Sequence, residues 1–124
     1  LFTSIGPLVV PCDESLIDAF TAVAGSGPAY LFYLAEAMID AAIELGFDAD
    51  TADRVVRATL SGSAALLAAE PASPATLRAA VTSKGGTTAA AINVFDEANT
   101  NAIIRRALRA ARDRGTELGR SATV

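Results

Sequence analysis

The stretch that decides the fold is Pro28–Leu45, which reads PAYLFYLAEAMIDAAIEL. Its only charged residues are Glu36, Asp40 and Glu44, and their i, i+4, i+8 spacing puts them in one narrow stripe of a helix. The rest of the circumference carries large apolar side chains, namely Tyr30, Leu31, Phe32, Tyr33, Leu34, Met38, Ile39 and Ile43. A helix that is apolar nearly all round is buried on nearly all sides. We expect a second chain or a further domain to cover part of it, the alternative being a monomer with this helix at its centre.

Helix signals continue on both sides of this stretch. Gly46 ends the long helix, and Asp48 is a suitable cap for the next one. Gly62 lies in a run of small residues inside that next helix, which indicates either a close crossing with another helix or a kink. The other predicted helices are Ser15–Ala24, Ala49–Ala69, Pro74–Val81, Gly86–Glu97 and Thr100–Leu118. The sequence therefore predicts an all-α fold, a compact bundle of about five or six helices with one long buried central helix.

Composition excludes several classes of protein. Hydrophobic residues make up 52% of the 124 residues, so a packed globular domain is expected. No apolar run reaches the roughly 18 residues of a membrane span, so no membrane partner is expected. The single cysteine, Cys12, rules out a disulfide within the chain and favours a cytoplasmic protein. Because the chain has no histidine, it has no Ser-His-Asp or Cys-His catalysis, and we expect no metal site.

The net charge of −4 is unevenly distributed. Residues 1–104 carry four basic and twelve acidic side chains, whereas residues 105–124 carry six arginines and two acidic side chains. The arginines resemble a nucleic-acid patch. Cations near the end of a terminal helix also complement the helix dipole, which is the simpler explanation. We therefore expect no nucleic-acid partner.

One segment has the composition of a binding site: Thr82–Thr88, which reads TSKGGTT and precedes a predicted helix. Adjacent glycines let a ligand approach the main chain, and the start of a helix offers free N–H groups with partial positive charge. The hydroxyls of Ser83, Thr87 and Thr88 add short polar groups. Together these features suit a small anion such as a carboxylate. An ordinary capped helix start remains an alternative, and the chain contains neither a Walker loop nor a Gly-x-Gly-x-x-Gly motif.

Two motifs link the chain to a known family. The segment SKGGTTAAAINVF at 83–95 resembles the signature of pyrroline-5-carboxylate reductases, whose usual form runs Ser-Pro-Gly-Gly-Thr-Thr. AGSGPAY at 24–30 is similar to the start of that family's long central helix. The motifs occur in the family's order, about 55 residues apart, and the resemblance covers essentially all of residues 1–120.

The resemblance implies a function. Such enzymes transfer hydride from NADPH or NADH to 1-pyrroline-5-carboxylate and form L-proline, the last step of proline biosynthesis. A separate N-terminal Rossmann domain holds the nucleotide, so residues 1–124 alone are expected to be inactive and to contain no cofactor-binding residue. Residues 1–14 are then an extended linker from that domain, 15–120 the helical dimerisation and substrate-binding domain, and 121–124 a tail. The family's helical domains interleave as a homodimer, and a higher oligomer is left open.

The same resemblance assigns residues to the substrate. Ser83, Gly85, Gly86, Thr87 and Thr88 are placed at the substrate carboxylate and ring, and Thr88 is the catalytic candidate near the ring nitrogen. A protonated cyclic imine is already an electrophile, so a site without histidine agrees with this chemistry.

The chain departs from the family pattern at two places. Lys84 replaces the usual proline, which makes the loop less rigid or adds a charge that attracts carboxylate, unless the lysine is simply solvated. Ser73-Pro74 stands where a His-Pro pair is common. Just before it, Glu70 matches an acidic residue near the family's site or is an ordinary charge at a helix end.

Two other functions remain as alternatives. The first is a stand-alone helical dimerisation module without catalysis. The second is the helical domain of a related dehydrogenase that acts on another small acid.

Overall fold

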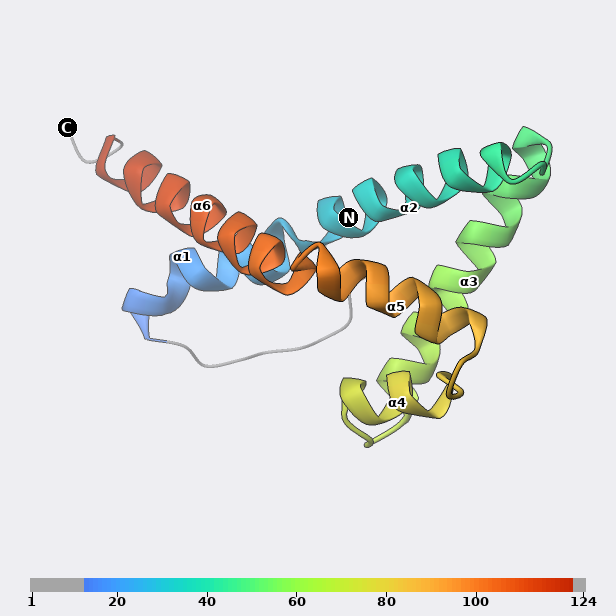
Figure 1. The fold of residues 1–124 in the computed structure, drawn as a ribbon. Helices are drawn as coiled ribbons and strands as arrows, with labels where there is room; N and C mark the ends of the chain where they lie inside the picture. The colour runs from blue at the N-terminus through green and yellow to red at the C-terminus, as the bar shows by residue number, and fades with distance from the viewer. Residues whose placement is uncertain (1–12, 122–124) are drawn as a thin grey trace. The chain divides into compact units, whose positions relative to one another are not determined.

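The computed structural model describes residues 13–121, and every regular element in that range is helical (Figure 1). The elements are a 3₁₀ turn (Glu14–Leu16), α1 (Ile17–Phe20), a π-helical turn (Thr21–Gly25), α2 (Gly27–Glu44), α3 (Ala49–Ala69), α4 (Pro74–Ala80), α5 (Thr87–Glu97) and α6 (Thr100–Ser121). The predicted all-α class is confirmed. Cys12, nearly all of the expected linker and most of the expected tail lie outside the described residues.

Local capping chemistry explains most helix boundaries. Gly46 has φ of +105°, and its N–H donates to the carbonyl of Ile43 while the N–H of Phe47 donates to that of Ala42. This pair of bonds is a Schellman motif, which ends α2 and needs the left-handed conformation that glycine adopts readily. At the start of α4, the Ser73 hydroxyl accepts from the N–H of Thr76, and Pro74 occupies the first helical position.

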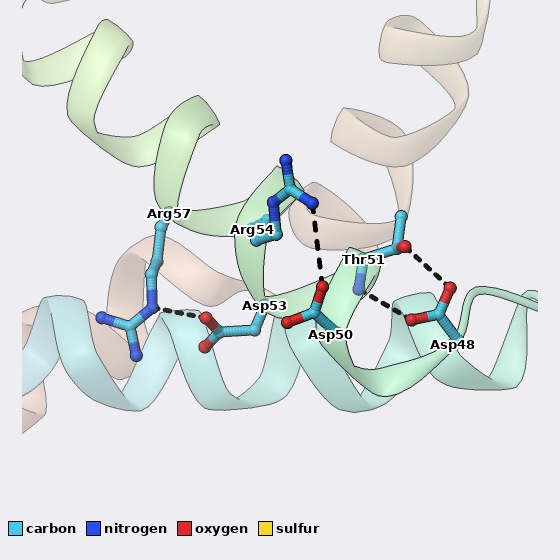
Figure 2. Close-up of polar contacts among 6 residues, drawn as sticks. All are labelled: Asp48, Asp50, Thr51, Asp53, Arg54 and Arg57. Carbon is cyan, nitrogen blue, oxygen red and sulfur yellow. Dashed lines mark hydrogen bonds and ion pairs between the residues drawn. The ribbon is translucent and has the colours of Figure 1, made fainter.

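The start of α3 is held by a polar cluster (Figure 2). The Asp48 carboxylate accepts from both the backbone N–H and the hydroxyl of Thr51, at 2.9 and 2.7 Å. The N–H bond from Thr51, followed by its hydroxyl bond, holds the pKa of Asp48 below the ordinary value of 3.8. One turn later Arg57 donates to Asp53 at 2.7 Å, which lowers the pKa of Asp53 and raises that of Arg57. These groups are solvent-exposed, so they fix the helix start more than they stabilise the whole fold.

The described chain divides into two units, residues 13–27 with 105–121 and residues 28–104. In the first unit the Asp18 carboxylate accepts from the Thr116 hydroxyl at 2.7 Å. A Cβ on Gly115 would lie 3.2 Å from the same carboxylate, so the glycine lets α1 and α6 approach closely there. Ala22 is buried in this unit.

In the second unit, Ala52 and Val56 of α3 are buried, whereas α2 has no buried residue. The side chains of Leu31, Phe32 and Tyr33 are 57%, 68% and 76% exposed. Residues 28–104 therefore do not themselves bury this apolar helix, and the expected burial of α2 requires cover from outside this unit.

Two further expectations concern Gly62 and the end of α6. Apart from its chain neighbours and the nearby backbone of α3, nothing lies within 4 Å of a Cβ placed on Gly62, so no other helix of residues 28–104 crosses closely at that residue. α6 continues to Ser121, three residues past the predicted end at Leu118. Gly115 and Gly119 lie within this helix and do not interrupt it. Over residues 13–121, no helix combines the length and the apolar character needed to span a membrane.

Candidate functional site

The sequence-predicted site lies in the loop between α4 and α5, and its first residue is anchored to α4. The Thr82 hydroxyl donates to the carbonyl of Arg78 at 2.6 Å, and the Thr82 N–H donates to that of Ala79. These bonds satisfy carbonyl groups that the end of a helix leaves without partners. They also fix the direction in which the chain leaves α4.

Residues Ser83 to Gly86 form a tight turn. The Gly86 N–H donates to the Ser83 carbonyl at 3.0 Å, and Gly85, the third residue, has φ of +71°. Lys84 is the second residue of the turn. Among the non-glycine residues of 13–121, only Asn99 has a positive φ, so the φ of Lys84 is negative. The signs of φ and the hydrogen bond match a type II turn, whose third position favours glycine and whose second position suits proline. Gly85 is thus required for its backbone conformation.

Gly86 contributes through the space that it leaves rather than through its backbone conformation. Its φ of −82° and ψ of 176° are open to any residue. A Cβ at this position, however, would overlap the hydroxyl oxygen of Ser83 and lie 3.2 Å from the Ser83 carbonyl oxygen. Gly86 is also the N-cap of α5 and supplies no side-chain cap. The structure therefore places the Ser83 hydroxyl against the start of α5.

The first turn of α5 provides the remaining groups. The leading N–H groups of a helix have no partners within it. Thr87 is exposed and Thr88 is half-buried, and neither hydroxyl forms a hydrogen bond with any other described residue. Helix N–H groups beside free hydroxyls can bind a small anion. All five sequence-predicted residues, Ser83, Gly85, Gly86, Thr87 and Thr88, thus belong to one turn and the helix start that follows it.

Other candidate residues lie apart from this loop. Glu70 is exposed at the C-terminal end of α3, where its N–H donates to the carbonyl of Leu66. Within the described residues, no hydrogen bond or ion pair joins it to the loop. A shallow surface pocket belongs to α3 alone and is lined by Thr51, Arg54, Val55 and Ala58. Sequence reasoning missed the contact between Ser83 and Gly86, although the four-residue turn spacing could have indicated it.

The comparisons with known proteins agree on one family. The model described as pyrroline-5-carboxylate reductase dimerisation matches residues 14–118. A pyrroline-5-carboxylate reductase of Pseudomonas aeruginosa is 44% identical over 118 residues, which are 95% of this chain and 43% of that protein. A solved pyrroline-5-carboxylate reductase structure from Coxiella burnetii has a TM-score of 0.88 and 37% identity, over 93% of this chain and 43% of that one.

A second solved structure, Plasmodium falciparum pyrroline carboxylate reductase with NADP bound, has a TM-score of 0.84 and 25% identity. The match covers 90% of this chain and 45% of that one. The chain therefore spans less than half the length of each of these relatives.

Proposed function

The chain belongs to the pyrroline-5-carboxylate reductase dimerisation family, and from that premise we propose that it is the substrate-binding and dimerising part of such a reductase. The complete enzyme transfers hydride from NADPH or NADH to 1-pyrroline-5-carboxylate and forms L-proline. The observation that carries this proposal is the Ser83–Gly86 turn directly before α5, because it presents N–H groups and hydroxyls where a carboxylate can bind.

The residues of the loop have distinct roles in the proposed mechanism. The substrate carboxylate accepts hydrogen bonds from the leading N–H groups of α5 and from the Ser83 hydroxyl. This contact fixes the ring relative to Thr88, whose hydroxyl orients the ring nitrogen. Positioning is the main requirement, because a protonated imine accepts hydride without a strong acid from the protein. Gly85 and Gly86 keep the backbone in shape and open to the ligand.

The nucleotide is assigned to another part of the protein. The chain contains no Gly-x-Gly-x-x-Gly motif, and residues 13–121 form no βαβ unit, so the described residues do not fit a dinucleotide. The bound cofactor supplies the hydride. NADP in the Plasmodium falciparum relative supports a dinucleotide cofactor. We also propose a cytoplasmic location, since the single cysteine suits a reducing compartment.

We further propose that the protein is a homodimer through this domain. The exposed apolar residues of α2, with Leu66 and Leu67 of α3 at 48% and 50% exposure, support this proposal because monomers rarely leave large apolar surfaces uncovered. The family description points to the same role.

The test is turnover by the intact protein that carries this chain. Reduction of 1-pyrroline-5-carboxylate to proline is expected to be coupled to oxidation of NADPH or NADH, which is the signal to be measured. Residues 1–124 alone are expected to show neither turnover nor saturable NADPH binding in calorimetry. An intact protein that dimerises but does not turn over would instead favour a dimerisation module, and turnover of another small acid alone would favour a related dehydrogenase.

A further inference from the structure

The cations of the second unit are distributed unevenly. Residues 28–104 carry nine acidic side chains and only four basic ones, Arg54, Arg57, Arg78 and Lys84. Arg54 and Arg57 lie 3.7 and 2.7 Å from Asp50 and Asp53. Within the described residues, neither Arg78 nor Lys84 forms an ion pair. Of the two unpaired cations of this acidic unit, Arg78 thus lies in the last turn of α4 and Lys84 lies in the α4–α5 loop itself.

Lys84 is the more informative of the two. It is the only lysine of the chain, since the other nine basic residues are arginines. It is the second residue of the turn, is exposed, and lies two positions before the N-cap of α5. Proline is better suited to that turn position, so lysine is not explained by the turn conformation. Its place in the chain is better explained by its charge.

We propose that Lys84 is a substrate-binding residue whose ammonium group attracts the substrate carboxylate to the loop. This inference rests on the proposed reductase function. An acidic surface repels an anionic substrate, and one cation at the binding loop offsets that repulsion at the place where the carboxylate binds. The lysine charge has the same sign as the partial charge at the start of α5, so the two act together on a carboxylate. The ammonium is compact and carried on a flexible stem, so it reaches the anion without fixing the ring.

The expected effect is moderate because the side chain is exposed to solvent. A unit charge several ångströms from a carboxylate in water changes affinity by about two- to fivefold. The effect on the Michaelis constant should therefore depend on salt, since the Debye length shortens from about 30 Å at 0.01 M to about 10 Å at 0.1 M. Turnover should stay nearly constant, because the charge acts on binding and not on hydride transfer.

The experiment uses steady-state kinetics of the intact protein with Lys84→Gln, Lys84→Arg and a matched control, Arg120→Gln. Arg120→Gln removes one positive charge from the last turn of α6, outside the loop. Lys84→Gln is expected to raise KM for 1-pyrroline-5-carboxylate about two- to fivefold and to remove most of its salt dependence. Lys84→Arg and Arg120→Gln should stay close to wild type, and L-proline affinity in calorimetry should fall by the same factor in Lys84→Gln.

Three outcomes contradict the proposal while leaving the reductase function intact. They are an unchanged KM and salt dependence in Lys84→Gln, the same change in Arg120→Gln, or a change in the KM for NADPH alone. The last would mean that Lys84 serves the nucleotide phosphates. Absence of turnover in the wild-type protein would instead overturn the reductase function, and this inference with it.

Discussion

The hydroxyl oxygen of Ser83 lies in the space into which a Cβ on residue 86 would project. Gly86 therefore keeps the Ser83 hydroxyl at the start of α5, although its own φ and ψ suit any residue. Gly85, in contrast, has open space around a built Cβ but a φ of +71° that side chains disfavour. Gly86 thus serves the loop by leaving space for the Ser83 hydroxyl, whereas Gly85 serves it by adopting a backbone conformation that other residues disfavour.

Substitution of Gly86 should impair substrate binding more than folding. Gly86→Val displaces the Ser83 hydroxyl and crowds the N–H groups that we assign to the carboxylate. A lost hydrogen bond to a charged group costs about 1.5–3 kcal/mol, so KM should rise about 10- to 100-fold. Kinetics together with thermal unfolding of the intact protein checks this. A KM within about twofold of wild type would show that the carboxylate binds elsewhere.

Substitution of Gly85 should act through backbone strain. Gly85→Ala forces an alanine into the left-handed region at a cost of about 1–2 kcal/mol, which the loop relieves by changing shape. Gly85→Asn should be milder, since asparagine tolerates that region better. We expect KM to follow the order wild type, Asn, Ala. Equal effects of Asn and Ala would mean that the side chain, and not the conformation, is the problem.

Most of this loop could be predicted because its determinants are local in sequence. The same holds for the caps at Asp48 and Ser73, where residues three positions apart fix the helix start. Contacts between distant residues were not accessible in this way. The hydrogen bond from Thr116 to Asp18 joins residues 98 positions apart, and no periodic pattern in the sequence predicts it. The sequence also could not predict which residues cover α2, because no residue of this helix is buried by the described residues.

Thr88 should matter through its hydroxyl. Thr88→Ala removes the group that we place near the ring nitrogen and should lower turnover about 10- to 100-fold, whereas Thr88→Ser retains the hydroxyl and much of the activity. Steady-state kinetics of both variants separates this role from packing of a half-buried side chain. If both variants stay within about twofold of wild type, Thr88 is not a catalytic residue.

The exposed face of α2 should control assembly. Phe32 is 68% exposed, and Phe32→Asp places a charge in the surface that we assign to the second copy. Loss of the dimer and of thermal stability are expected together, because obligate dimers often lack a stable folded monomer. Sedimentation of the intact protein measures this, with Glu36→Asp on the polar stripe as the control. A Phe32→Asp variant that stays dimeric would place the interface elsewhere.

The Asp48 cap should make stability depend on pH in a defined direction. The bonds from Thr51 lower the pKa of the folded carboxyl below its ordinary value of 3.8. A lowered folded pKa means that the carboxylate stabilises the fold above about pH 3.8, and that this contribution is lost as pH falls through the folded pKa.

Asp48→Asn keeps an acceptor for the Thr51 N–H but removes the charge, so its Tm should be below that of wild type at pH 7 and converge with it below the folded pKa. Asp48→Ala removes the cap as well, so a difference in Tm should persist at low pH. Thermal unfolding at fixed protein concentration between pH 2.5 and 7, with Glu36→Gln in the middle of α2 as a control away from a helix start, measures these curves. A constant gap between wild type and Asp48→Asn across that range would show that the charge of Asp48 does not contribute, and that only its acceptor oxygen holds the start of α3.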